Sequence, residues 1–217
     1  MKKSLKNTTI YQKLKKIFFP FYRSNDTKKL FDILEKGKQK DTQAAMFVGG
    51  CVRKFLTNEN IDDIDIASIF SPEEIKEKFK DSEFKIIETG IEHGSVTAIL
   101  NSSKFEITTL RQDIKTNGRH AEVSFIYNWK DDSNRRDFTI NAIYMDRRGK
   151  IYDPQNGRED LKNNKVKFIG DPSTRIEEDY LRIIRFIRFS IHYNNKESES
   201  KAIEAVKLNL NGIKNLS

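Results

Sequence analysis

The pattern of apolar and polar positions divides the chain into short strands and short helices. Apolar runs and period-two alternation predict strands. These lie at residues 44–48, 64–67, 84–88, 95–100 and 105–110. The first ends at a Gly-Gly pair, which is typical of a turn, and a short helix over 52–56 is predicted to follow it. The three strands from 84 to 110 follow one another closely, as in hairpins.

Amphipathic spacing predicts further helices. Residues 27–36 (TKKLFDILEK) form one candidate, and Ser71-Pro72-Glu73-Glu74 is a typical start of another, with serine as cap and proline in the first turn. Near the C-terminal end, apolar residues recur at helical spacing at Ile176, Ile183, Ile187 and Ile191, which predicts one long helix with these side chains buried. Ser173 or Thr174 would open that helix, with Glu177 completing a capping box from Thr174. The pattern as a whole predicts an α+β fold.

The positive charge of the chain lies mainly at its start. The 217 residues carry a formal charge of +8, and residues 1–40 contain twelve Lys or Arg against three Asp or Glu. Such a segment is attracted to polyanions such as RNA or an anionic membrane surface, although a solvated lysine-rich tail explains it equally well.

Cysteine content and apolar run length limit the class of protein. With a single cysteine, Cys51, the chain forms no internal disulfide and no cysteine-based metal site, which agrees with a reducing cytoplasm. The apolar run at 17–22 is too short to cross a bilayer and contains a proline. We therefore expect a cytoplasmic protein without a membrane partner.

Two aspartates stand in an otherwise apolar strand. Because side chains alternate along a strand, Asp63 and Asp65 share one face while Ile64 and Ile66 enter the core. Adjacent carboxylates repel each other unless a cation neutralises them, and Mg²⁺ prefers oxygen ligands. The alternative is a strand end with solvated acids.

The residues before the aspartates favour phosphate chemistry. Gly49 and Gly50 allow close approach of the backbone to a ligand, and the helix after them presents free N–H groups. Arg53 follows in the first turn. A phosphate-binding turn, an arginine and an acid pair within seventeen residues are the parts that phosphoryl transfer requires.

The same stretch resembles the signature of the class II tRNA nucleotidyltransferase and bacterial poly(A) polymerase family, a branch of the DNA polymerase β-like superfamily. The family pattern is G-G-x-V-R-D, then L-L-G, then D-x-D. Positions that match are Gly49, Gly50, Val52, Arg53, Leu56, Asp63 and Asp65. Lys54 stands where the family usually has aspartate, Asn58 where it has glycine, and Asn117 replaces a further aspartate.

The resemblance continues through HGSVTAIL, FEITTLRQD, TNGRHAEVSF and RRDFTINAIYMD, which lie between residues 93 and 146. It implies a nucleotidyltransferase head with a small mixed sheet, followed by the start of an all-helical neck. The implied boundaries are 1–24 for the basic segment, 25–170 for the head and 171–217 for a partial neck. Residues 116–125 correspond to a flexible loop that closes over the nucleotide.

The resemblance also implies the functional residues. Asp63 and Asp65 would bind Mg²⁺, and Glu106 would be a third catalytic acid, although a surface pairing of Glu106 with Arg111 or Lys104 is equally compatible with the sequence. The implied nucleotide-binding residues are Gly49, Gly50, Arg53, Arg111, Arg136, Asp137, Asn141, Asp179, Arg182 and Arg185. Asp137 can also cap the short helix that follows it.

Asp179 and Arg182 stand in an E-D-x-x-R motif, three residues apart. An ion pair within the helix is the ordinary interpretation of that spacing. In the family, this motif is a protein template that hydrogen-bonds the base edge of the incoming CTP or ATP. A carboxylate and a guanidinium can read the amino group and adjacent ring nitrogen that C and A share.

The sequence thus predicts an enzyme that adds CCA to tRNA 3′ ends from CTP and ATP with Mg²⁺. A poly(A) polymerase shares the same motifs, and an inactive or split fragment that only binds nucleotide or RNA is an alternative of another class. In the family, the RNA-holding helical domains occupy about as much chain again as the head. We therefore expect either that a second polypeptide supplies them or that this chain is barely active alone. The role of the basic segment and the oligomeric state are left open by the sequence.

Overall fold

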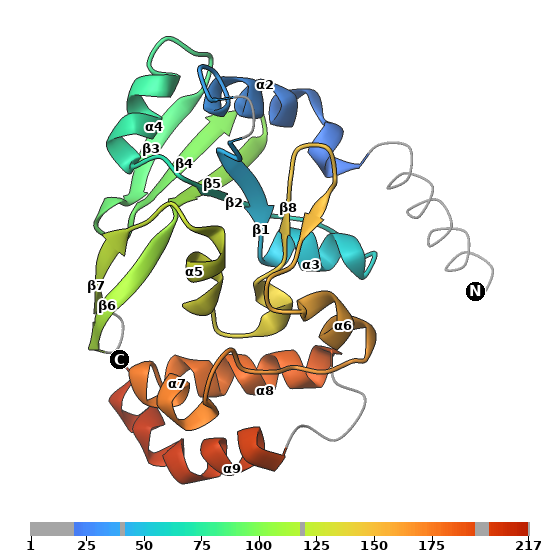
Figure 1. Cartoon of the computed structure of the whole chain (residues 1–217), viewed down its shortest axis with the longest axis vertical. Helices are drawn as coiled ribbons and strands as arrows, with labels where there is room; N and C mark the ends of the chain where they lie inside the picture. The colour runs from blue at the N-terminus through green and yellow to red at the C-terminus, as the bar shows by residue number, and fades with distance from the viewer. Residues whose placement is uncertain (1–19, 40–41, 118–119, 194–199, 217) are drawn as a thin grey trace, which may run out of the picture.

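The computed structural model describes residues 20–39, 42–117, 120–193 and 200–216. A sheet with flanking helices forms the upper part of the molecule in Figure 1, and three C-terminal helices lie below it. The main sheet has the strand order β3-β4-β5-β2-β1-β8-β9. Its strands are β1 (Ala45–Val48), β2 (Ile64–Ser68), β3 (Lys85–Gly90), β4 (Ser95–Leu100), β5 (Ser103–Thr109), β8 (Tyr144–Met145) and β9 (Ile151–Tyr152). β2 and β5 run parallel and the other neighbours antiparallel, so the mixed sheet predicted from sequence is confirmed.

Helices on one face of the sheet enclose the main core. They are α2 (Asn25–Leu34), α3 (Gly50–Leu56) and α4 (Pro72–Phe79). Leu30, Phe31, Phe47, Ile66 and Phe105 are fully or almost fully buried there. Each such side chain contributes about 1.5–3 kcal/mol by leaving water. The predicted start of α4 is confirmed, since Ser71 and Glu74 form a capping box and Pro72 occupies the first turn.

The opposite face carries a smaller apolar cluster under α5 (Trp129–Asn134). Met46, Val48, Ala67, Leu110 and Tyr144 form this cluster, and Trp129 packs against it. Short 3₁₀ turns and one short helix complete this part of the chain: η1 (Phe21–Arg23), η2 (Ile91–His93), η3 (Thr139–Asn141) and α6 (Gly157–Lys162).

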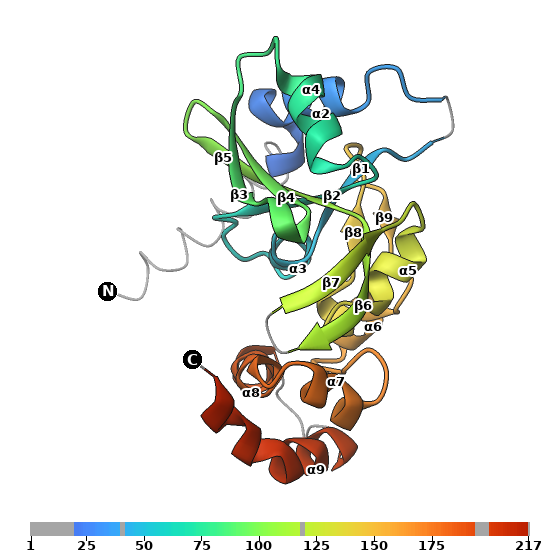
Figure 2. The ribbon, with the colours of Figure 1, turned by 90° about the vertical axis from the view of Figure 1, so that its left-hand side faces the viewer.

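The segment expected to be a flexible loop, 116–125, belongs instead to a hairpin in the structure. β6 (Arg111–Asn117) pairs antiparallel with β7 (His120–Phe125), apart from the main sheet. Backbone hydrogen bonds join the two strands, and the closing of this segment over a nucleotide stays a prediction. The Gly-Arg pair at 118–119 lies outside the described residues. The hairpin extends from the sheet toward the C-terminal helices (Figures 1 and 2).

The long helix predicted from residue 173 onward is two helices. α7 (Pro172–Glu178) ends at Asp179, whose backbone is extended with φ −156°, and α8 (Leu181–Tyr193) follows. The cap is also different from the predicted one: the carboxylate of Asp171 accepts the backbone N–H of Thr174 at 3.0 Å. The remaining elements are α9 (Ser200–Asn209) and η4 (Leu210–Asn215), and α9 packs against α7.

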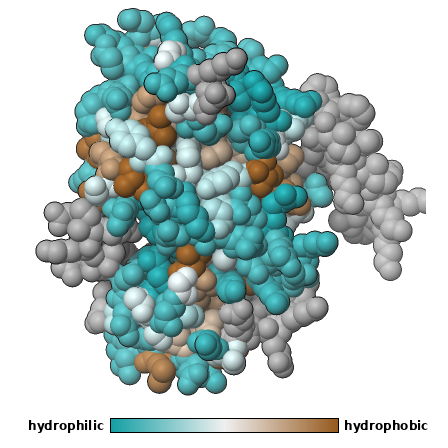
Figure 3. Space-filling model, viewed as in Figure 1, coloured by the Kyte–Doolittle hydropathy of each residue, from teal (hydrophilic) through white to brown (hydrophobic). Residues whose placement is uncertain are grey.

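Only half of the apolar stripe predicted for the single long helix is buried, and its four residues are divided between α7 and α8. Ile176 and Ile183 are buried, but the exposed fraction is 44% for Ile187 and 81% for Ile191. The break at Asp179 changes the face that α8 presents, so Phe186 and Phe189 enter the core instead. Ile184, Ile187 and Ile191 form an exposed apolar row. The face seen in Figure 3 is mainly hydrophilic with scattered hydrophobic patches, and none of the described helices is long and apolar enough to cross a membrane.

Candidate active site

Two of the predicted acids, Asp65 and Glu106, lie side by side on β2 and β5. Asp65 is the second residue of the strand, and its register partner on the parallel strand β5 is Glu106. Asp63 precedes the strand by one residue and is exposed, as is Glu106. Asp65 therefore lies beside Glu106, the third carboxylate that the family resemblance implied, whereas Asp63 lies outside the strand. Among the described residues, no three His, Cys, Asp or Glu side chains are grouped closely enough to be a preformed metal site.

The electrostatics of this cluster favour a bound cation. Burial, followed by the negative charge of Glu106, raises the pKa of Asp65 above its ordinary value. Within the part of the chain that the structure describes, none of the three acids forms an ion pair, so the alternative pairing of Glu106 with Arg111 or Lys104 is not observed. Carboxylates that form no ion pair fit a divalent cation such as Mg²⁺, which would be held by Asp63 and Asp65.

The Gly-Gly turn lies directly against Asp65. A Cβ atom on Gly49 would stand 3.6 Å from the Asp65 Oδ2, and one on Gly50 would stand 3.7 Å from it. Gly49 has φ +70° and ψ −127°, a conformation that side-chain-bearing residues rarely adopt. α3 begins at Gly50, two residues before the predicted start, and Cys51 is buried so completely that the pKa of its thiol rises to about 12. The absence of a Cβ atom on either glycine therefore keeps the backbone of the turn close to the carboxylate.

Four of the predicted nucleotide-binding residues form one chain of polar contacts. An Arg53 Nη1 donates to the amide oxygen of Asn141, whose nitrogen donates to Asp137 at 2.9 Å. The other oxygen of Asp137 forms an ion pair with Arg185 of α8 at 2.7 Å. The predicted capping of the following 3₁₀ turn by Asp137 is not observed, because Phe138 is at the cap position. The chain of contacts instead links α3, η3 and α8.

The guanidinium of Arg53 is enclosed by aromatic rings of α8. It lies 4.8 Å from the ring centroid of Phe189 and 5.1 Å from that of Tyr193, distances typical of cation–π contacts. Arg53 is only 7% exposed. The Tyr193 hydroxyl donates to Glu59 at 2.9 Å, so the end of α8 also holds the loop that leads to Asp63. Direct contact of Arg53 with a triphosphate stays a prediction.

Arg136 belongs to a second network, centred on an acid that the sequence analysis did not identify. The Asp132 carboxylate is fully buried and accepts from Arg135 at 2.8 Å, from Arg136 at 3.0 Å and from the Tyr144 hydroxyl at 2.6 Å. Burial alone would raise the pKa of Asp132, but the charges of Arg136 and Arg135 hold it well below its ordinary value. A simple capped helix would leave both arginines exposed, whereas here each forms an ion pair with Asp132.

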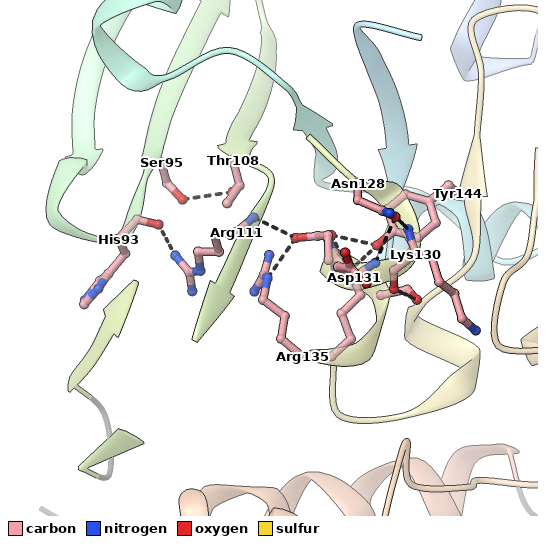
Figure 4. Close-up of polar contacts among 12 residues, drawn as sticks. His93, Ser95, Thr108, Arg111, Asn128, Lys130, Asp131, Arg135 and Tyr144 are labelled. Atoms are coloured by element: carbon pink, nitrogen blue, oxygen red, sulfur yellow. Dashed lines mark hydrogen bonds and ion pairs between the residues drawn. The ribbon is translucent and has the colours of Figure 1, made fainter. Parts of the chain in front are cut away.

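Arg111 points away from this network. Its guanidinium donates to the backbone oxygen of His93, while its backbone N–H donates to Asp132 at 3.3 Å (Figure 4). The structure therefore places the Arg111 side chain on the η2 side of the hairpin. Asp132 had no distinctive signal in the sequence beyond its place four residues before Arg136, where a helical ion pair is possible.

The proposed base-selecting pair is not joined in the structure. The Arg182 Nη1 donates to Glu178 at 2.5 Å and to the backbone oxygen of Arg175 at 2.6 Å. Asp179 instead accepts the backbone N–H of Leu181 at 2.9 Å and begins α8. The ordinary prediction of an Asp179–Arg182 ion pair is therefore wrong, because the helix breaks between the two residues. The partner of Arg182 is Glu178, which the sequence analysis did not select.

The departures from the family pattern are accommodated locally. Lys54 forms an ion pair with Asp62 at 2.8 Å, next to the acid cluster. Asn58 has φ +59°, the left-handed region that glycine would occupy and that asparagine tolerates better than most residues. Asn117 lies at the end of β6.

The mixed sheet, with acids beside a Gly-Gly helix start, agrees with the nucleotidyltransferase head that the sequence resembles. Comparison with known proteins agrees with this class: the sequence model of the "Poly A polymerase head domain" matches residues 45–167. The chain belongs to this family.

Similar proteins support the assignment. The chain is 42% identical over 182 residues to "CCA tRNA nucleotidyltransferase 1, mitochondrial" of Danio rerio, covering 82% of this chain and 42% of that one. It is 44% identical over 167 residues to the "CCA-adding enzyme" of Lactobacillus helveticus, covering 74% of this chain and 40% of that one. The crystal structure of the Bacillus stearothermophilus CCA-adding enzyme in complex with CTP has a TM-score of 0.75 and 31% identity, and the match covers 89% of this chain and 46% of that chain. The chain thus spans less than half the length of these relatives.

Proposed function

We propose that this chain carries the catalytic part of a template-independent nucleotidyltransferase that completes tRNA 3′ ends with CCA, using CTP and ATP. The observation that carries the proposal is the register of Asp65 with Glu106, which sets unpaired carboxylates beside the Gly49-Gly50 turn. The relatives named for CCA addition, and one solved in complex with CTP, support the choice of substrate.

The chemistry is phosphoryl transfer to the RNA 3′-hydroxyl. Bound Mg²⁺ would supply a Lewis acid that stabilises charge on the reacting phosphate and on the leaving pyrophosphate. Asp63 and Asp65 would hold it, and Glu106 adds negative charge beside Asp65. Gly49 and Gly50 carry no Cβ atom, so their backbone would let the triphosphate approach close to these acids. Arg53 would supply positive charge from the first turn of the helix that begins at Gly50.

Base selection is proposed for the junction of α7 and α8. Asp179 has an extended backbone there, and its carboxylate accepts from one backbone N–H. Arg182 is held by Glu178, which in turn is bound by Arg175 at 2.5 Å. The Asp179 carboxylate would accept from the amino group of C or A. To donate to the adjacent ring nitrogen, Arg182 must exchange one of these contacts for the base or use a nitrogen that Glu178 does not occupy.

We expect Arg182→Ala to lose discrimination against UTP and GTP as well as rate. A role confined to the ion pair with Glu178 predicts only a stability loss of about 1.5–3 kcal/mol and unchanged selectivity. Arg188→Ala is the matched control, because Arg188 is an exposed arginine of the same helix. Single-nucleotide incorporation ratios measure the difference, and equal ratios in parent and variant would remove the template role.

The function itself is tested by supplying purified chain with Mg²⁺, a tRNA that lacks its CCA end, and each NTP singly and in pairs. We expect CTP alone to be added, and ATP to follow only after CTP. Repeated addition of ATP without CTP would identify a poly(A) polymerase instead. No incorporation with any NTP, together with nucleotide binding, would favour the inactive or split fragment.

Two further expectations depend on this function. A second polypeptide that holds the RNA stays a prediction, and the exposed row Ile184, Ile187 and Ile191 is the surface that it would cover. A cytoplasmic location also stays a prediction, since the Danio rerio relative is named as mitochondrial.

A further inference from the structure

A second concave site lies on the same face of the sheet as the acids. It is a cleft of about 740 Å³ between α5, the residues before it and the β8–β9 hairpin, which lie side by side in Figure 2. Tyr127, Trp129 and Tyr152 supply aromatic surface, Met46 and Ile151 further apolar surface, and Lys150 a positive charge. The volume is within the range of about 300–1,000 Å³ that is usual for small-molecule sites.

The cleft and the acid site are connected through the sheet. Met46 pairs with Ala67, which stands two residues after Asp65 on β2, so all three share one face. At about 3.3 Å per residue, Asp65 and Ala67 are about 7 Å apart along β2. Tyr144 borders the cleft: its ring centroid lies 5.6 Å from that of Trp129 and 6.0 Å from that of Tyr152.

The side chains of the cleft suit a nucleobase with an attached phosphate. Tyr127 is 79% exposed and Tyr152 is 40% exposed, so both offer ring faces for stacking. Asp146 accepts two backbone N–H groups through one carboxylate oxygen, and the amide nitrogen of Gln43 donates to Ala45, which leaves an acceptor oxygen on each. Acceptors match the amino groups of adenine and cytosine, whereas uracil has none.

Lys150 supplies the phosphate contact. It is exposed, and among the described residues its ammonium forms no ion pair. An apolar peptide would use neither the acceptor oxygens of Asp146 and Gln43 nor the ammonium of Lys150. RNA uses both, together with the stacking surface, and its 3′ end must already reach the acids nearby.

We propose that this cleft binds one nucleotide of single-stranded RNA, close to the 3′ end that the acid site extends. The identity of the ligand as RNA rests on the proposed function, but the site itself is separate from the catalytic acids. Bases that carry an amino group bind more tightly there than uracil does.

Trp129 makes the test direct, because it is the only tryptophan of the chain. Hexamers of A, C and U are titrated into the whole chain without Mg²⁺ or NTP, and the tryptophan fluorescence is recorded. We expect saturable quenching by the A and C hexamers, with weaker binding of the U hexamer. Tyr127→Ala should weaken binding roughly 5- to 150-fold, since a stacked base contributes about 1–3 kcal/mol, and Tyr127→Phe should restore it.

Charge and catalysis provide the controls. Lys150→Gln should weaken binding, whereas Lys162→Gln, at an exposed lysine of α6, should not. RNA should quench the tryptophan fluorescence of Asp65→Ala as much as that of the parent. A failure of the proposed catalytic role is therefore distinguishable from a failure of this site. Absence of quenching by RNA, equal binding by Tyr127→Ala, or stronger quenching by an unstructured peptide would each overturn the proposal.

Discussion

Asp65→Ala is expected to lower nucleotide incorporation on the order of a thousandfold or more. The variant removes the carboxylate that lies beside both Glu106 and the Gly-Gly turn. Loss of a carboxylate that holds the metal ion would raise the free energy of the transition state by several kcal/mol. Asp62→Ala is the matched control, because Asp62 is an exposed aspartate three residues away that pairs with Lys54. Incorporation of labelled CTP into tRNA measures both. Retention of most activity in Asp65→Ala would make the acid assignment wrong.

Thermal melting tests the same assignment without relying on activity. Because the pKa of Asp65 is raised in the fold, the parent loses stability as pH rises above the ordinary carboxyl value of 3.8, where the ionised form is penalised. Asp65→Asn escapes this penalty because asparagine does not ionise. At pH 7 without Mg²⁺ the variant should therefore melt no lower than the parent, and the difference in melting temperature should vanish in acid. Mg²⁺ should then stabilise the parent more than the variant. A variant that melts well below the parent would contradict the electrostatic argument.

Asp132→Ala should destabilise the fold by about 3–5 kcal/mol, the range for removing one partner of a buried ion pair. The substitution leaves Arg135, Arg136 and the Tyr144 hydroxyl without their shared acceptor. Urea unfolding followed by circular dichroism measures the loss. Asp131→Ala, at the exposed neighbour in the same helix, should cost less than about 1 kcal/mol.

The pH dependence of the Asp132 effect has the opposite sign to that of Asp65. The folded-state pKa of Asp132 is lowered, so its stabilising contribution is complete above the ordinary value of 3.8 and is lost as pH falls below it. The difference between parent and Asp132→Ala should therefore narrow in acid. A stability loss below about 1 kcal/mol at pH 7 would show that the network is not important for folding.

The sequence was sufficient to predict the acid strand and its neighbours. Alternation in 64–67 and the glycine pair at 49–50 are local signals, and the structure has a strand and a helix start there. The five predicted strands all occur, within about two residues of their expected limits. Strand alternation also places Asp65 on the face opposite to Ile66, because a period of two leaves little freedom once one face is buried.

Long-range contacts explain what the sequence did not predict. Nothing local distinguishes Asp132 from the exposed Asp131 beside it, since its burial depends on Tyr144, twelve residues later. Likewise, helical spacing continues through Asp179, but the carboxylate there begins a second helix, and Phe189 and Tyr193 then pack on Arg53, far away in sequence. In both places, the burial of Asp132 and the helix break at Asp179, tertiary packing overrides the local sequence pattern.

The enclosure of Arg53 by Phe189 and Tyr193 has a thermodynamic consequence. If the positive charge of Arg53 acts on a nucleotide at the acids, the affinity for that nucleotide depends on how α8 is seated against α3. By linkage, nucleotide binding then increases the population of molecules in which α8 is seated, by the same factor. Any ligand that displaces α8 would accordingly weaken nucleotide binding without touching the acids.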